Sequence, residues 1–142
     1  MMDKKDFEII EQLKADSRAS IKKISQKTKL RPSTVHKRIE KLKGKKIIES
    51  FTIRLNDKEV GESFIVFMLV KGGTEEYIDN RFINNKNVKE VFGITGEYDL
   101  LIKLKFGNVE EFNDYILGFR KNNKNIASTL TMVATKKIKE EF

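Results

Sequence analysis

Hydrophobic positions in the first third of the chain follow the three- and four-residue spacings of amphipathic helices. Residues 3–16 and residues 20–28 each carry such a pattern, and Ser20 is a good N-cap for the second stretch. Pro32, the only proline, suits the first turn of a third helix that should end near Gly44. The inward-facing residues of this third helix are Val35, Ile39 and Leu42. We therefore predict three short helices, the last two joined by a short turn.

After the third helix the pattern changes from helical spacing to alternation. The apolar residues of this stretch are Ile47, Ile48, Phe51, Ile53 and Leu55. Alternation with polar residues is typical of a half-buried strand, and a polar stretch over residues 56–62 follows it. We predict that residues 1–58 form a first domain with a linking strand, and that residues 59–142 form a second domain.

The second domain contains strand-like and helix-like stretches in a recognisable order. The expected strands cover residues 64–70, 88–95, 100–106 and 126–135, and the expected helices cover residues 75–84 and 108–119. The order βαββαβ is the split-βαβ arrangement of ferredoxin-like domains. The predicted fold class is α+β, a winged-type helix-turn-helix followed by a ferredoxin-like βαββαβ domain.

One face of the predicted sheet needs a cover. Both helices of such a domain lie on one face of the sheet, so strands with a solvated second face should alternate. Residues 64–70 are instead apolar at seven consecutive positions, and residues 100–106 offer apolar side chains to both faces. A partner subunit is the simplest cover, and a first domain that folds back over the sheet is the alternative.

The positive charge of the chain is concentrated in the first domain. The net charge is +8. Residues 1–58 hold 17 Lys or Arg against 8 Asp or Glu, a net charge of +9, whereas residues 59–142 hold 12 against 13. A basic domain beside a near-neutral one indicates that the first binds a polyanion such as nucleic acid. The alternative is a lysine excess that serves solubility alone.

Cysteine is absent, and His36 is the only histidine. These counts exclude disulfides, thiolate nucleophiles and cysteine-based zinc sites, and a Ser-His-Asp arrangement would need a histidine near a nucleophile. The chain also lacks an apolar run of about 18 residues and the layout of a secretory signal. We expect a cytoplasmic protein that is not an enzyme, needs no cofactor or metal and does not enter a membrane.

The predicted second and third helices form a helix-turn-helix, in which the third helix would lie in the major groove of DNA. The side of this helix away from its apolar stripe carries polar and basic side chains. The candidates for contacts with bases and phosphates are Ser33, Thr34, His36, Lys37, Arg38 and Lys41. Lys22, Lys23 and Lys27 of the second helix would lie toward the DNA backbone. The alternative is a helix that is basic only for solubility.

Several short stretches occur in a characteristic order and spacing. They are Asp3-Lys-Lys-Asp6 with Ile9, Ile10 and Leu13, then Asp16-Ser-Arg18, Pro32-Ser-Thr-Val-His-Lys-Arg-Ile-Glu-Lys-Leu42, Ile47-Ile48, and Gly96-Glu-Tyr-Asp99 in the βαββαβ domain. In these stretches the chain resembles the Lrp/AsnC, or feast/famine, transcriptional regulators over nearly its whole length. Their combination, in this order and spacing, is characteristic of the family.

The resemblance implies a second domain that dimerises through its sheet and often assembles dimers into tetramers or octamers. It also implies that a small effector, commonly an amino acid, binds between dimers near one loop. The matching residues are Thr95, Gly96, Glu97, Tyr98 and Asp99. The alternative is an ordinary hairpin turn, in which Gly96 supplies a positive φ and Asp99 hydrogen-bonds nearby backbone.

The chain departs from the family pattern around the third helix. Lys29 stands where the family usually has a glycine in the turn before this helix, and Arg31 stands where a serine usually caps it. We therefore expect a non-glycine residue in a left-handed position and a weak cap. Gly44 also precedes by two residues the position of Lys46, where the family commonly has glycine.

Rival functions have weaker support. The strand over residues 100–106 lacks the exposed aromatics and glycines of an RNA-binding sheet. An acylphosphatase-like hydrolase would need an arginine in a phosphate-cradling loop, and neither Arg81 nor Arg120 lies in a glycine-rich loop. We therefore predict a sequence-specific regulator that binds imperfect palindromes in double-stranded DNA as a homodimer or higher oligomer. An architectural, largely non-specific DNA-binding protein is the alternative.

Overall fold

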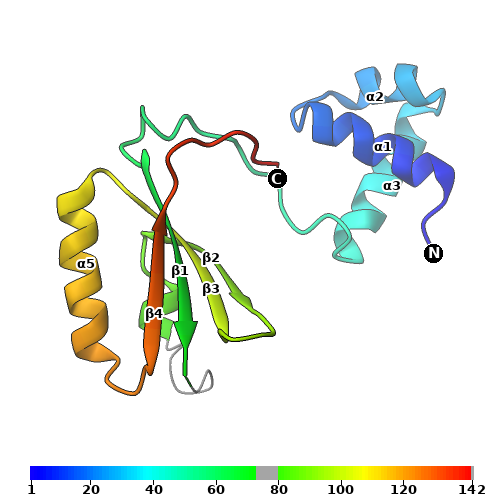
Figure 1. Cartoon of the computed structure of the whole chain (residues 1–142). Helices are drawn as coiled ribbons and strands as arrows, with labels where there is room; N and C mark the ends of the chain where they lie inside the picture. Colours follow the sequence, from blue (N-terminus) through cyan, green and yellow to red (C-terminus); the bar gives the residue numbers. More distant parts are fainter. Residues whose placement is uncertain (73–79, 142) are drawn as a thin grey trace. The chain divides into compact units, whose positions relative to one another are not determined.

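The computed structural model of the chain describes residues 1–72 and 80–141 (Figure 1). The chain divides into two compact units, Met1–Arg54 and Leu55–Phe142. Within the described ranges, none of the helices has the length and hydropathy that a membrane span requires.

The first unit consists of three helices, α1 (Lys4–Ala15), α2 (Ile21–Thr28) and α3 (Pro32–Gly44). As predicted, the Ser20 hydroxyl caps α2 by accepting a hydrogen bond from the Lys23 amide at 3.1 Å, and α3 ends at Gly44. The buried side chains that form one core from all three helices are Ile9, Ile24, Val35 and Ile39. The predicted helix-turn-helix is therefore confirmed.

The segment after α3 differs from the prediction. Residues 45–63 contain no strand, so the expected linking strand is wrong. Its alternating apolar residues, Phe51, Ile53 and Leu55, are exposed by 49%, 72% and 52%. A strand needs a neighbour to satisfy its backbone N–H and C=O groups, and residues 1–63 offer none. For the same reason no strand in this range forms a wing beside the helix-turn-helix.

The second unit has the predicted βαββαβ order. Its elements are β1 (Phe64–Lys71), α4 (Asn80–Ile83), β2 (Val88–Gly93), β3 (Leu100–Phe106), α5 (Val109–Asn122) and β4 (Ser128–Val133). The four strands are antiparallel in the order β2-β3-β1-β4. The helix α5 runs three residues beyond its predicted end, and β4 is shorter than predicted. Of the helix expected over residues 75–84, the part before residue 80 lies outside the described residues.

The two helices of this unit share one face of the sheet and build its core there. Helix α5 contributes Ile116 and Phe119, and α4 contributes Phe82, whose ring centroid is 5.6 Å from that of Phe119. The buried strand residues of this core are Val66, Met68, Val70, Leu100, Ile102, Leu104 and Phe106. Their spacing of two along β1 and β3 places them on a single face.

The opposite face of the sheet, which we call the open face, is also apolar. By strand register, its apolar residues are Ile65, Phe67, Leu69, Phe92, Leu101, Leu130 and Met132. Phe92, Leu130 and Met132 are 52%, 44% and 43% exposed. Both described helices of the unit lie on the other side of the sheet, so these side chains have no helix over them.

One end of the open face carries a charge cluster that the sequence pattern did not predict. Lys105 Nζ lies 2.7 Å from Asp57 Oδ1 and 3.7 Å from Glu140 Oε1, and Lys103 pairs with Glu90 and Glu140. Figure 1 shows the C-terminal segment, in red, running over the end of the sheet beside the segment that precedes β1. These two segments therefore bury the two lysines.

Candidate nucleic-acid interface

The exposed side of α3 carries most of the side chains predicted to contact DNA. Val35, Ile39 and Leu42 are 0%, 7% and 2% exposed, which confirms the predicted inward stripe. The candidates that lie away from this stripe are Ser33, Thr34, His36, Lys37 and Lys41. All of these are exposed except Thr34, which is half-buried. The structure thus places hydroxyl, imidazole and ammonium groups on one helix surface.

Arg38, the remaining candidate on α3, is held at the start of α1. Its Nη1 lies 2.7 Å from Asp3 Oδ2 and 2.6 Å from Asp6 Oδ1. Burial opposes ionisation of Asp6, but hydrogen bonds from Arg38 and from the Asp3 amide outweigh it and lower its pKa. This cluster ties α3 to α1. These hydrogen bonds are all made by Nη1, which leaves Nε and Nη2 as the donors for a contact between Arg38 and DNA.

The three candidate lysines of α2 are exposed. Lys23 Nζ lies 2.9 Å from Asp16 Oδ2, and this hydrogen bond lowers the pKa of Asp16. Lys22 and Lys27 form no ion pair with any residue in the described part of the chain. These two are the α2 cations that are available to a polyanion without breaking a contact.

The turn between α2 and α3 adds two cations that the predicted interface did not include. Lys29 has a φ of 57°, and Arg31 makes no side-chain hydrogen bond at the N-cap of α3, so both expected departures are confirmed. The turn is closed instead by the Ser25 hydroxyl, which donates to the Leu30 carbonyl. The signal for these cations was present in the sequence, because each replaces the residue type that best suits its backbone position.

The predicted effector residues lie together in the connection between β2 and β3. Of these residues, Thr95, Gly96 and Glu97 are exposed. Asp99 Oδ2 accepts a hydrogen bond from the Gly72 amide at 2.7 Å, and Glu97 Oε1 lies 3.9 Å from Lys71 Nζ. Gly96 has a φ of 121°, which other residues rarely adopt. Asp99 therefore has a structural role as well as a place in the loop.

Taken as a whole, the first unit offers a polar and basic helix surface, and the second offers an apolar sheet face and an exposed loop. Within residues 1–72 and 80–141, no group of three or more His, Asp or Glu is placed to hold a metal ion. These features define a class: a helix-turn-helix DNA-binding protein with an α+β companion domain.

Both units match known domain families. Residues 2–43 match the AsnC-type helix-turn-helix domain, and residues 63–142 match the Lrp/AsnC ligand binding domain. The chain therefore belongs to the Lrp/AsnC family of transcriptional regulators, which confirms the resemblance seen in its sequence. Members of this family are regulators of transcription and not enzymes.

Relatives and a solved structure match this chain over nearly its full length. An uncharacterized HTH-type transcriptional regulator of Pyrococcus abyssi is 33% identical over 100% of this chain and 98% of its own. HTH-type transcriptional regulator FL11 of the same organism is 33% identical over 98% of this chain and 93% of its own. The structure of a Neisseria meningitidis transcriptional regulator in complex with L-Met is similar with a TM-score of 0.92. It is 21% identical, and the match covers 99% of this chain and 94% of that chain.

Proposed function

We propose that the protein regulates transcription by binding specific sites in double-stranded DNA as a dimer or higher oligomer. The observation that carries this proposal is the exposed surface of α3, which is polar and basic opposite a fully buried apolar stripe. A helix of this kind fits the major groove, where hydroxyl and imidazole groups exchange hydrogen bonds with base edges. Lys37 and Lys41 reach guanine edges or phosphates from the same surface.

The open face of the sheet supports the dimer. Phe92, Leu130 and Met132 on this face are 52%, 44% and 43% exposed, and a contiguous exposed apolar patch often marks a protein–protein interface. A second copy of the same face covers it with a surface of matching chemistry, as a two-fold interface requires. Such a dimer presents two α3 helices to DNA, so its site is an imperfect palindrome with half-sites about 10 base pairs, or a multiple, apart.

The exposed loop after β2 supports a small effector. The match of residues 63–142 to a ligand binding domain favours an effector site in this unit, and the Neisseria meningitidis regulator was solved with L-Met. The loop offers a carboxylate at Glu97 and exposed backbone at Gly96, groups that bind an α-ammonium and an α-carboxylate. We assign the effector site to Thr95, Gly96, Glu97, Tyr98 and Asp99.

Replacing Lys37 tests the DNA-binding surface. Lys37→Ala should weaken binding because it removes a cation from the centre of the exposed arc. A loss of affinity concentrated at one base position would assign Lys37 to a base edge, and a uniform loss with a salt slope shallower by about 1 would assign it to phosphate. Lys43→Ala is the matched control, because Lys43 lies beside the buried stripe and pairs with Glu40. Equal affinity of Lys37→Ala and parent at every salt concentration would remove α3 from the interface.

The effector loop is tested by melting the protein with each of the common L-amino acids at millimolar concentration. A ligand that binds only the folded state raises the melting temperature. We expect at least one amino acid to do so, and Glu97→Ala to reduce that rise. Glu110→Ala, which removes an exposed carboxylate from α5, should retain it. A rise of the same size in Glu97→Ala would place the effector elsewhere.

A further inference from the structure

Two non-glycine residues in the described part of the chain have left-handed backbone conformations, and both are lysines. Lys29, at the end of α2, has a φ of 57°, and Lys46, after the end of α3, has a φ of 53°. A side chain in this region brings its Cβ close to the following carbonyl oxygen, which is why glycine is preferred there. A lysine at such a position therefore costs stability relative to glycine.

The Lys29 side chain does not offset this cost within the fold. It is exposed and makes no hydrogen bond or ion pair with any described residue. Other residues hold the turn: Ser25 donates its hydroxyl hydrogen to the Leu30 carbonyl, and Lys5 Nζ donates to the Thr28 carbonyl at 2.7 Å. The turn is thus held together without the ammonium group of Lys29.

Arg31, two residues later, is a second cation at a position where another residue type would stabilise the backbone better. It occupies the N-cap of α3, where serine, threonine, asparagine or aspartate would accept a hydrogen bond from the first turn. Arg31 makes no such bond, is exposed, and has no ion-pair partner among the described residues. Two positions of one short turn therefore carry a cation in place of the residue that would best stabilise the backbone.

Positions that break a local structural rule without a compensating contact in the fold are expected at functional sites. Here the two exceptions, Lys29 and Arg31, each add a positive charge shortly before Ser33 and Thr34, which lie on the exposed surface of α3. Lysine and arginine side chains are the usual partners of DNA phosphates, and such contacts set the position and register of the protein on the duplex.

We propose that Lys29 and Arg31 form a phosphate-binding pair that clamps the turn of the helix-turn-helix to the DNA backbone beside the bases contacted by α3. This inference rests on the proposed DNA-binding function and adds two residues to its interface. The pair contributes affinity that is independent of sequence, whereas the α3 surface contributes specificity.

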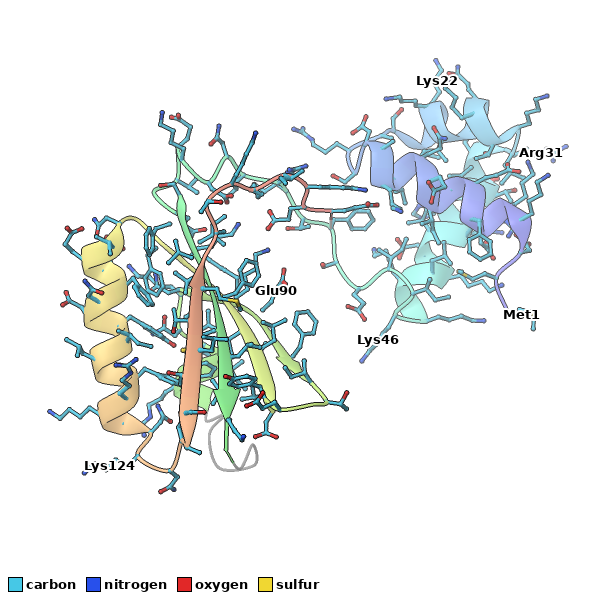
Figure 2. The ribbon with its side chains drawn as sticks, in the orientation of Figure 1. Met1, Lys22, Arg31, Lys46, Glu90 and Lys124 are labelled. Atoms are coloured by element: carbon cyan, nitrogen blue, oxygen red, sulfur yellow. The ribbon has the colours of Figure 1, made fainter. Side chains whose placement is uncertain are left out.

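Lys46 provides an internal control for this proposal. It has the same residue type, the same left-handed conformation and an exposed side chain, so its replacement by glycine changes charge and backbone in the same way. Figure 2 shows Arg31 and Lys46 at well-separated ends of the first unit. They flank the two ends of α3, whose 13 residues span about 20 Å. If both lysines only reflect a lysine-rich composition, their glycine variants should behave alike.

The test measures affinity for a double-stranded DNA oligonucleotide by fluorescence anisotropy at several salt concentrations. The probe is a bound sequence from a random-pool selection, with a scrambled duplex beside it. We compare the parent with Lys29→Gly, Arg31→Ser, Lys46→Gly and Lys37→Ala. Removing one side chain that binds a phosphate should lower affinity about five- to tenfold near 0.1 M salt and make the log–log salt slope shallower by about 0.9.

We expect Lys29→Gly and Arg31→Ser to weaken binding in this way equally on both duplexes, and Lys46→Gly to bind as the parent does. Melting curves should show both glycine variants at or above the melting temperature of the parent, which separates weaker DNA binding from a defect in folding. Parent-like affinity and salt slope in Lys29→Gly or in Arg31→Ser would remove that residue and overturn the pair. An equally weakened Lys46→Gly would overturn the proposal as well.

The phosphate-binding pair and the proposed function can fail separately. If Lys37→Ala weakens DNA binding while Lys29→Gly and Arg31→Ser do not, the phosphate-binding pair is wrong and the proposed function stands. If the random-pool selection recovers no bound DNA, the proposed function fails and the phosphate-binding pair fails with it.

Discussion

Arg38 shows how a residue in a basic helix can serve the fold. Helical periodicity places it beside the buried stripe of α3, where a basic residue can turn either to DNA or to a neighbouring helix. The structure pairs it with Asp3 and with Asp6, whose side chain is 3% exposed. A carboxylate this deeply buried needs a partner, because an unpaired charge there would lose its hydration without compensation.

Arg38→Ala should therefore destabilise the first unit. It leaves the Asp6 carboxylate without its main hydrogen-bond donor, and we expect the free energy of unfolding to fall by about 1–2 kcal/mol. Chemical denaturation followed by circular dichroism measures this change. Lys41→Ala, on the exposed arc of the same helix, should leave stability within about 0.5 kcal/mol of the parent. Unchanged stability in Arg38→Ala would contradict the structural role.

At the residue scale, periodicity could predict which α3 side chains are buried, since Val35, Ile39 and Leu42 follow one face of a helix. It could not predict that Arg38 is paired, because its partners lie 32 and 35 residues away and only the fold brings them together. The two unfavourable positions of the turn were predictable at Lys29 and Arg31, where the residue types conflict with the local backbone.

At the scale of elements, the segment before β1 and the segment after β4 act together. Asp57 and Glu140, one from each segment, flank Lys105 at one end of the sheet. The hydrogen bond from Lys103 lowers the pKa of Glu140 despite the opposing effect of burial. For Asp57, burial opposes ionisation, but hydrogen bonds from Lys105 and Lys137 lower its pKa. These ion pairs attach the segment before β1 and the segment after β4 to β3.

This cluster should make stability depend on pH. A carboxyl group with a lowered folded-state pKa stabilises the protein above its unfolded pKa, about 4.3 for glutamate, and loses that contribution as the pH falls through the folded value. Glu140→Gln should lower the free energy of unfolding by about 1–2 kcal/mol at pH 7. Its difference from the parent should shrink as the pH falls below about 4.

Melting temperatures between about pH 7 and pH 3, a range that spans the ionisation of the carboxyl groups, test this dependence. Glu141→Gln is the matched control, because the side chain of this neighbouring residue is 63% exposed and its variant should give a profile like that of the parent. Coincident profiles for Glu140→Gln and the parent would show that the Glu140 carboxylate does not contribute to stability.

The elements themselves were largely predictable, and the misses have physical causes. The strands of the second unit follow from apolar runs and the turn residues between them. The strand expected near Ile53 fails because alternation describes only the side chains, whereas a strand also needs a partner for its backbone. The burial of Lys103 and Lys105 could not be predicted, because lysine in a strand normally indicates a solvated face. These two lysines are buried by the segment before β1 and the segment after β4, which only the fold brings together.

At the scale of the whole molecule, the open face is the feature that decides assembly. An apolar sheet face of this kind is stable in water only when something covers it. The charge cluster covers one end, and a second copy of the chain is our proposal for the rest. This arrangement assigns DNA contacts to the first unit and assembly to the second.

A charge on the open face should therefore dissociate the dimer. Leu130 is 44% exposed in the single chain, so Leu130→Lys should leave the fold intact and place an ammonium group in the interface. Light scattering after size exclusion should give a mass near 16.5 kDa for this variant and at least twice that for the parent. Leu117→Lys, on the exposed side of α5, should retain the dimer. A monomeric parent would contradict the proposed interface.

The central claim is that α3 gives sequence-specific recognition of double-stranded DNA by a two-fold assembly. The measurement that tests it most directly is selection of bound duplexes from a random pool at physiological salt, with the parent and Lys37→Ala side by side. We predict that the parent enriches an imperfect palindrome with half-sites about 10 base pairs, or a multiple, apart, and that Lys37→Ala weakens this enrichment. DNA that is bound without enrichment of any motif would contradict the claim and favour an architectural protein. No bound DNA at all would contradict DNA binding itself.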